Sequence, residues 1–432
     1  YDNLLFLDVT GRNDWSSTLP TDNNSYFYPS ATLSAIVSDM LEMPEFVTFA
    51  KLRAAYAEVG NDTDPYKLSS FFTNETPFGD NPILTESSLI PNADLKPEIT
   101  SSYEFGVDIR LFQSRVNLDA TYYDGRTKNQ IIPISTDISS GYTSKLINAG
   151  EVRNYGFEAM LNVVPVRTEN FTWNTMFNYS RNRSEVTDLG GIDYTLTSRN
   201  NVFIQAREGG SISALYGRGF LRVEDENSEY FGQKIVNNSG IPIRTDDLVY
   251  QGDYAADYTL GILNSFKYKS VDFGFMFDIR QGGTVVSMTK TIGSTSGQLK
   301  ETLEGRETGI VAEGVLETSP GVYTPNTINV DVRTYNNRYY ERDNVEAAKY
   351  DASYTKLREV TLGYTVPNRI IDKLPVSKAR LSLTGRNLAL WTDNPHFDPE
   401  TVSISGGTLQ PGIENMSYPS TRTYTLNLQI DF

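Results

Sequence analysis

Oppositely charged side chains two positions apart are the residues of this sequence best placed to bind a ligand. Asp108 and Arg110 form one such pair, and Asp278 and Arg280 form another. Residues two apart on a β-strand point to the same side of it, so each pair presents both charges on one face. Such a face could line a polar path, with Arg386 as a fifth candidate of the same kind. The favoured alternative is that these charges pair with each other or with a neighbouring domain and only satisfy a polar interior.

Catalytic and metal chemistry have little support. The only histidine, His396, lies in a loop with no nucleophile elbow nearby, and the chain has no cysteine for a thiolate site. Two acidic groups, Glu224-Asp225-Glu226 and the pair Asp398 and Glu400, could bind calcium. They lack EF-hand spacing, so solvated loop charge is the default interpretation. The sequence therefore predicts no enzyme, no cofactor and no metal site.

Charge and hydropathy exclude further classes of protein. The 432 residues include 38 basic and 54 acidic side chains, a net charge of −16, which is the wrong sign for a nucleic-acid binder. A mean hydropathy of −0.38 is too polar for a bundle of membrane helices. Such a polar chain with 27 tyrosines and 21 phenylalanines suits a secreted all-β protein or an outer-membrane β-barrel.

Strict period-two alternation is the strongest structural signal. The segment 423–432 places Tyr424, Leu426, Leu428, Ile430 and Phe432 on one face, against polar residues on the other. Similar segments predict fourteen strands, at 1–14, 26–38, 48–59, 101–112, 115–126, 151–164, 170–183, 200–207, 212–222, 256–268, 271–281, 353–366, 377–391 and 421–432. Many exceed a typical soluble strand and suit a tilted strand that crosses a bilayer.

The connections favour a barrel over a soluble sandwich. Short links at 113–114, 165–169, 208–211 and 269–270 alternate with long polar loops at about 60–100, 127–150, 223–255, 282–352 and 392–420. Short periplasmic turns and long extracellular loops produce this alternation in outer-membrane barrels. Two longer periplasmic links, 39–47 and 367–376, have helical or turn-like sequences. Phase breaks near 358–360 and at Asn387 predict β-bulges.

An ordered series of short motifs runs through the whole chain. It comprises Phe49 to Tyr56, Leu95-Lys96-Pro97-Glu98, Asn148 to Glu158, Asp351 to Tyr354, Gly385-Arg386-Asn387-Leu388, Asp398-Pro399-Glu400 and the terminal Phe432. With these motifs the chain resembles the SusC/RagA class of TonB-linked outer-membrane transporters of the Bacteroidota.

The resemblance implies an all-β fold, a transmembrane antiparallel β-barrel of about 22 strands with an N-terminal plug domain. The sequence yields about fourteen strands and no plug, so residues 1–432 are expected to be the C-terminal part of the barrel with its long extracellular loops. The resemblance also implies a multi-pass location in the outer membrane, in contact with lipid and lipopolysaccharide.

The same resemblance implies active import of a nutrient, either an oligosaccharide or an oligopeptide. Expected partners are a SusD-like surface lipoprotein that forms a lid, TonB acting through the N-terminal part, and a second transporter–lipoprotein pair in a dimer. Tyr335, Tyr339 and Tyr340 could stack on sugars or anchor the lid, although packing is the favoured interpretation. The alternative function is a passive porin-like or structural barrel.

Overall fold

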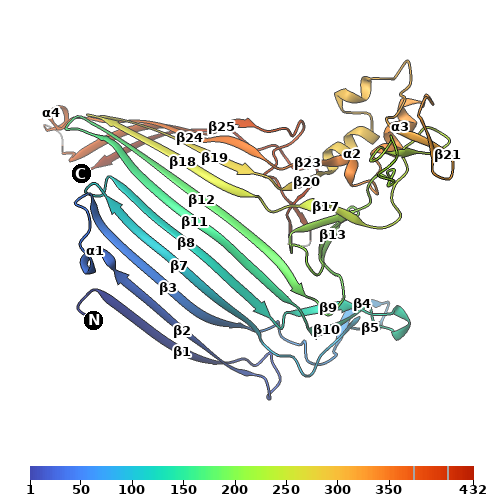
Figure 1. The fold of residues 1–432 in the computed structure, drawn as a ribbon, viewed down its shortest axis with the longest axis horizontal. Helices are drawn as coiled ribbons and strands as arrows, with labels where there is room; N and C mark the ends of the chain where they lie inside the picture. Colours follow the sequence, from blue (N-terminus) through green and yellow to red (C-terminus); the bar gives the residue numbers. More distant parts are fainter. Residues whose placement is uncertain (373–374, 406–407) are drawn as a thin grey trace. The chain divides into compact units, whose positions relative to one another are not determined.

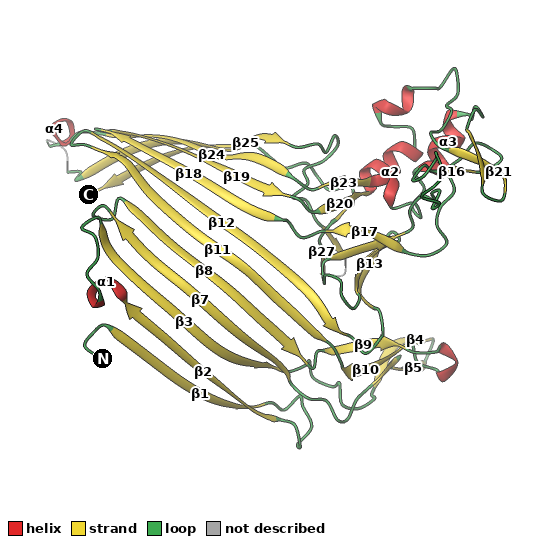
Figure 2. Ribbon diagram, viewed as in Figure 1, coloured by secondary structure: helices red, strands yellow, loops and turns green. Residues whose placement is uncertain are grey.

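The computed structural model describes residues 1–372, 375–405 and 408–432, which form two compact units. The first unit contains residues 1–194 and 206–212, and the second contains residues 195–205 and 213–432. Figures 1 and 2 show that long antiparallel strands dominate both, with a few short helices in the connections. Among the described residues, no helix has the length and apolar content needed to cross a membrane.

The first unit contains seven long strands, each paired with the next in antiparallel fashion. In Figure 1 they lie side by side from blue to green. They are β1 (Leu5–Trp15), β2 (Ser25–Ile36), β3 (Val47–Asn61), β7 (Glu98–Leu111), β8 (Val116–Lys128), β11 (Glu151–Arg167) and β12 (Phe171–Asp188).

The second unit contains five strands of the same kind, also paired in order. They are β18 (Tyr258–Tyr268), β19 (Val271–Gln281), β24 (Tyr354–Thr365), β25 (Lys378–Trp391) and β29 (Thr423–Asp431). The long strands of the two units are called wall strands below. Their lengths suit a tilted bilayer crossing, and all twelve were predicted from alternation.

Two predicted wall strands are wrong. The segments 200–207 and 212–222 contain only β14 (Val202–Ala206) and β15 (Ala214–Gly217), which pair with each other in a separate four-stranded sheet. Both are nearly fully buried, because Val202, Ile204 and Leu215 belong to a loop core, so their apolar residues do not mark an exposed face. At five and four residues they are also shorter than the roughly 9–11 residues of a membrane strand.

This correction merges three predicted connections into one, since the expected short link at 208–211 joins no wall strands. The described wall strands are therefore twelve rather than fourteen, and a single connection spans 189–257. Because two strands are removed together, the alternation of short and long links from β2 onward is unchanged. The short links lie at 37–46, 112–115, 168–170, 269–270 and 366–377, of which 373–374 lie outside the described residues.

The smaller elements lie in the connections between wall strands. The other strands are β4 (Phe72–Phe78), β5 (Asn81–Glu86), β6 (Leu89–Ile90), β9 (Ile131–Ser135), β10 (Ser144–Asn148), β13 (Tyr194–Arg199), β16 (Ile235–Val236), β17 (Val249–Asp253), β20 (Thr284–Ser287), β21 (Val315–Ser319), β22 (Val322–Pro325), β23 (Lys349–Asp351), β26 (Ser403–Ser405), β27 (Thr408–Gln410) and β28 (Ile413–Glu414). The helices are α1 (Val37–Met40), α2 (Met288–Thr295), α3 (Val332–Tyr339) and α4 (Asn368–Ile371), with 3-10 turns at Ile138–Ser140, Lys300–Leu303 and Glu346–Ala348. Helices α1 and α4 confirm the helical character predicted for the two longer short-side links.

Both predicted bulges are confirmed. The β19–β24 and β24–β25 pairings each shift register at Arg358, which has no partner in either ladder. Asn387 has a φ of +52°, a left-handed conformation that asparagine tolerates better than most residues. The extra residue at Arg358 explains why apolar side chains change from odd to even positions along β24.

Each sheet has one apolar face that is exposed. In the first unit, register aligns a row of apolar side chains across six strands, Leu7, Leu33, Ala54, Phe105, Tyr122 and Phe157. In the second unit the corresponding row is Phe273, Leu362, Leu383 and Leu426, all of them exposed. Large apolar rows left open on a soluble protein would aggregate, whereas lipid covers them in a membrane barrel.

Glycines on the opposite, polar face make room for side chains that cross a strand. In three places a side chain passes over a glycine and reaches the strand beyond: Arg53 over Gly106 to Asp119, Tyr123 over Gly156 to Asn182, and Arg380 over Gly363 to Asp272. A Cβ at any of these glycines would overlap the crossing side chain. The glycines therefore couple three strands at a time.

Replacing Gly156 with alanine is expected to lower the free energy of unfolding by about 1–3 kcal/mol, the usual range for overpacking. The new Cβ would lie 2.4 Å from the carbonyl oxygen of Arg181 and 2.5 Å from the Tyr123 hydroxyl. Gly125→Ala is the matched control, because its Cβ would meet nothing closer than 3.6 Å. Chemical unfolding in detergent micelles measures both, and equal stability of the two variants would contradict the crossing role.

Candidate functional site

Asp108 and Arg110 lie on the polar face of β7 and pair with each other. Arg110 Nη2 lies 3.2 Å from Asp108 Oδ2, and the guanidinium carbon lies 4.8 Å above the Phe49 ring. The expectation that these charges neutralise one another is confirmed for this pair. Both side chains nevertheless line a hollow of about 500 Å³, together with Asp119.

The same hollow holds acceptors that have no partner. Asn117, Asn162 and Asn174 line it, and the buried Oδ1 atom of each lacks a hydrogen-bond donor among the described residues. A buried carbonyl without a donor is destabilising. Each of these three oxygens therefore has hydrogen-bonding capacity that no described residue uses.

Asp278 and Arg280 do not pair with each other. Asp278 Oδ2 accepts from Arg358 Nη2 at 2.5 Å and from Arg358 Nε at 2.8 Å, because the bulge residue Arg358 turns toward β19. Arg280 instead donates from Nη2 to the carbonyl oxygen of Tyr254, and its buried Nε has no acceptor among the described residues. The prediction that the two charges of a pair bind each other is therefore wrong for Asp278 and Arg280.

Arg386, the fifth predicted residue, lies on the polar face of β25. Its Nε donates to Glu359 Oε2 at 2.9 Å, and 65% of the side chain is exposed. Arg386 belongs to the second unit, whereas Asp108 and Arg110 belong to the first. The five candidates are charged positions on the polar faces of two sheets, each with a protein partner.

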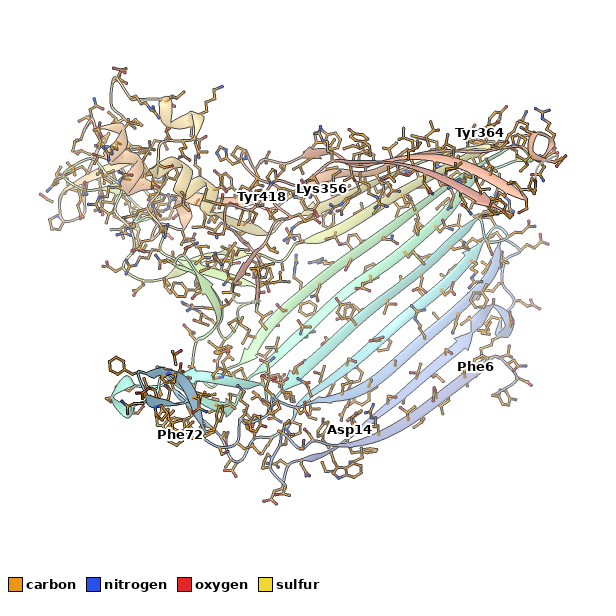
Figure 3. All side chains as sticks on the ribbon, turned by 180° about the vertical axis from the view of Figure 1, so that it is seen from behind. Phe6, Asp14, Phe72, Lys356, Tyr364 and Tyr418 are labelled. Carbon is orange, nitrogen blue, oxygen red and sulfur yellow. The ribbon has the colours of Figure 1, made fainter. Side chains whose placement is uncertain are left out.

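A buried ion-pair network at Lys356 was not predicted. Lys356 Nζ lies 2.7 Å from Asp398 Oδ2 and 2.5 Å from Glu400 Oε2, and only 3% of the lysine side chain is exposed. Arg358 bonds Glu400 as well, with Nη2 2.6 Å from Oε1. Together these contacts bind the loop after β25 to the start of β24, which is labelled at Lys356 in Figure 3.

The interpretation of Asp398 as solvated loop charge is therefore wrong, because its side chain is 4% exposed and paired. Hydrogen bonds from Arg358 lower the pKa of Glu400 to about 2, so this carboxylate is ionised at neutral pH. Both carboxylates bind cationic side chains and are not arranged for calcium. Among the residues that the structure describes, no three histidine or acidic side chains converge as metal ligands.

His396 lies beside an acidic side chain of the loop region. Its Nε2 lies 3.2 Å from Glu301 Oε1, and Glu301 also pairs with Lys290. Burial, followed by the nearby Lys290 charge, lowers the pKa of His396, so the ring is neutral at physiological pH. The histidine packs within the loop region of the second unit.

The predicted loop aromatics pack against one another. Tyr335 and Tyr339 stack with centroids 5.0 Å apart, and Tyr340 meets Tyr339 edge-on at 4.8 Å. Lys234 Nζ donates to the Tyr339 hydroxyl at 2.6 Å, and burial lowers the lysine pKa. Burial also raises the pKa of Tyr340 to about 12. These rings are partly buried and pack against one another and Lys234, which favours the packing interpretation.

The two-faced sheets, the alternating connections and the polar interior all point to a membrane barrel. The family model described as "TonB dependent receptor-like, beta-barrel" matches residues 1–388. The chain belongs to the TonB-dependent receptor family. Members of this family are outer-membrane β-barrels, and they are receptors and transporters rather than known enzymes.

Named relatives confirm the resemblance to the SusC/RagA class. TonB-dependent receptor P26 of Formosa agariphila is 30% identical over 100% of this chain and 45% of its own length. TonB-dependent receptor SusC of Bacteroides thetaiotaomicron is 24% identical over 100% of this chain and 42% of its length. The RagAB peptide importer in its closed-closed state has the same fold, with a TM-score of 0.78 at 19% identity over 100% of this chain and 46% of that one. The chain spans less than half the length of these relatives.

Proposed function

We propose that this receptor imports a nutrient, an oligosaccharide or an oligopeptide, actively across the bacterial outer membrane in a TonB-dependent manner. The observation that carries the proposal is the two-faced wall of a TonB-dependent receptor, apolar on the exposed side and ionic on the other. An ionic lumen wall binds polar solutes weakly and repeatedly, which suits a conduit. The proposed transport involves no enzymatic reaction.

The connections carry the outward-facing parts of the proposed transporter. We assign the long loops at 62–97, 129–150, 189–257, 282–353 and 392–422 to the extracellular side, and the short links to the periplasmic side. One solved structure with the same fold is described as the RagAB peptide importer. A SusD-like lipoprotein that closes over the long loops is the corresponding partner proposed here, with a dimer of such pairs as the assembly.

The polar faces of the wall strands supply the proposed solute path. Asp108, Arg110, Asp278, Arg280 and Arg386 are assigned to this path. Most of their charges already have protein partners, so each contributes an exchangeable contact rather than a deep binding site. A solute can pass along the wall only if it can both form these contacts and dissociate from them.

Growth of a deletion strain tests the proposal and the substrate class. A strain that lacks the gene for this chain is expected to lose growth on one class of nutrient, either oligosaccharides or oligopeptides, while growth on the corresponding monomers is retained. Reintroduction of the intact gene restores growth. Unchanged growth on every oligomeric nutrient tested would contradict import by this protein.

A further inference from the structure

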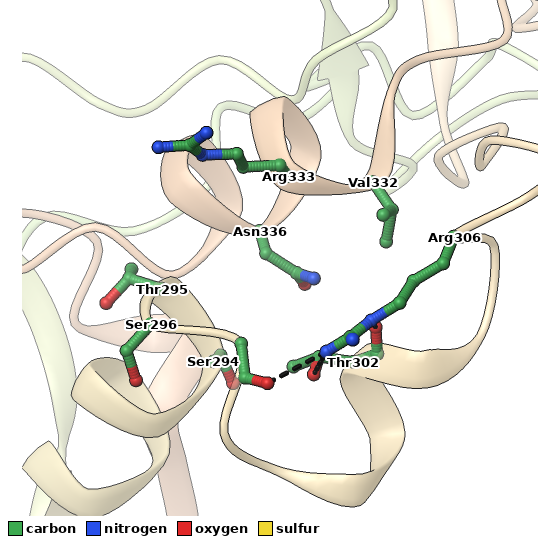
Figure 4. A pocket seen from close by; sticks show the side chains of 9 residues that line it. Ser294, Thr295, Ser296, Thr302, Arg306, Val332, Arg333 and Asn336 are labelled. Carbon is green, nitrogen blue, oxygen red and sulfur yellow. Dashed lines mark hydrogen bonds between the residues drawn. The ribbon is translucent and has the colours of Figure 1, made fainter.

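A polar hollow in the loop region of the second unit is not used by the proposed path. It has a volume of about 590 Å³ and lies between α2, the 3-10 turn Lys300–Leu303 and α3. Figure 4 shows the side chains that line it. The lining residues are Ser294, Thr295, Ser296, Gly297, Thr302, Arg306, Val332, Arg333 and Asn336. A volume of this size suits a ligand as large as a sugar ring or a dipeptide.

The hollow contains a buried polar group without a partner. The Ser294 side chain is 1% exposed, and its Oγ has no hydrogen-bond partner among the described residues. Asn336 is 8% exposed and directs its amide toward the same space (Figure 4). A buried hydroxyl is normally hydrogen-bonded, so the unpartnered Ser294 Oγ indicates a ligand or an ordered solvent molecule near this position.

The charge of the hollow is positive in a chain that is strongly acidic. Two arginines line it and no carboxylate does, whereas the whole chain carries a net charge of −16. Arg306 is held in place, since it donates from Nε to the Thr302 carbonyl at 2.9 Å and from Nη2 to the Gly297 carbonyl at 2.9 Å. Within the described part of the chain, neither Arg306 nor Arg333 forms an ion pair with an acidic residue. A guanidinium that is held in place but has no acidic partner, such as that of Arg306, is suited to bind an oxyanion.

We infer that this hollow binds the carboxylate or sulfate group of an anionic solute, with Arg333 and Arg306 supplying charge and Ser294 and Asn336 supplying neutral hydrogen bonds. The absence of aromatic side chains among the lining residues argues against recognition by ring stacking. The inference deepens the proposed function, because it assigns an acidic group to the solute that this receptor captures.

Calorimetric titration of the purified full-length receptor in detergent tests the site. Glucuronate, N-acetylglutamate and inorganic sulfate are the anionic probes, and glucose is the neutral probe, at constant ionic strength. Arg333→Ala is expected to weaken binding of the anions about tenfold or more, the effect of losing one charge-assisted hydrogen bond. Arg338→Ala, on the same helix but outside the lining, is the matched control and is expected to bind normally.

Ser294→Ala supplies a second readout. Removing an unpaired buried hydroxyl is expected to leave the thermal midpoint of the ligand-free protein unchanged or higher, while affinity for the anions falls a few-fold.

Glucuronate binding alone indicates a sugar acid, and N-acetylglutamate binding alone indicates a peptide. The site is refuted if glucose binds as tightly as glucuronate, if no anion binds, or if Arg333→Ala and Arg338→Ala behave alike. Because binding is measured without transport, a receptor that imports but fails this test keeps its proposed function.

Discussion

Replacing Lys356 with methionine is expected to lower the free energy of unfolding by about 3–5 kcal/mol, the usual effect of removing one partner from a buried ion pair. The ammonium group is enclosed between Asp398 and Glu400, and the Asp398 carboxylate has almost no contact with solvent. Without the lysine, Asp398 would be a buried charge whose one remaining donor among the described residues is the backbone N–H of Glu400, at 3.0 Å. The loop after β25 would then be held to β24 by the Arg358–Glu400 ion pair without the lysine, and we expect it to loosen.

Chemical unfolding in micelles and limited proteolysis of the 392–422 loop measure this effect. Lys349→Met is the control, because Lys349 is exposed and is expected to change stability by less than about 0.5 kcal/mol. Replacing both charged partners, in Lys356→Met with Asp398→Leu, should recover most of the loss, since no buried charge is left alone. A loss below about 1 kcal/mol in the single variant would show that the network does not hold the loop.

Replacing Leu383 with arginine is expected to destabilise the membrane-inserted protein by about 2–4 kcal/mol, the range for a cation on the lipid face near the bilayer centre. Leu383 is 50% exposed and lies between Leu362 and Leu426 on the two neighbouring strands. A guanidinium at this position would have to enter the hydrocarbon or distort the bilayer around it.

Thr384→Arg is the matched control, one residue further along the same strand. Thr384 lies on the polar face, where its hydroxyl is 3.0 Å from that of Thr361. A cation there would lie on the polar face of the strand rather than in hydrocarbon, so we expect little loss of stability. Folding equilibria in lipid vesicles compare the two variants, and similar losses in both would argue against a lipid-facing row at Leu383.

Alternation identified the wall strands because lipid and lumen impose opposite polarity on successive residues. Every wall strand described by the structure was predicted, and the bulge at Arg358 was visible as a phase break. The same reasoning failed at 200–207 and 212–222, where alternate apolar residues are buried in a loop core. An alternation of apolar and polar residues shows which side chains share a face of a strand. It does not show whether that face contacts lipid or protein.

The candidate site was less predictable, because strand spacing reveals only local neighbours. The Asp108–Arg110 pair is two residues apart and was found. Asp278 pairs across 80 residues with Arg358, and Lys356 pairs across 42 residues with Asp398. Such contacts depend on strand register and on the path of a long loop. The repeated spacing of two in Lys356 and Arg358, and in Asp398 and Glu400, was the only available signal.

Energised uptake is the most direct test of active import. Cells that carry the gene for this chain would be given a radiolabelled oligomer of the class identified by growth, with and without a protonophore that collapses the inner-membrane proton gradient. The proposed mechanism predicts accumulation in energised cells that disappears with the protonophore and with deletion of the gene. Gene-dependent uptake that continues at the same rate after the gradient collapses would contradict active import and would support a passive barrel.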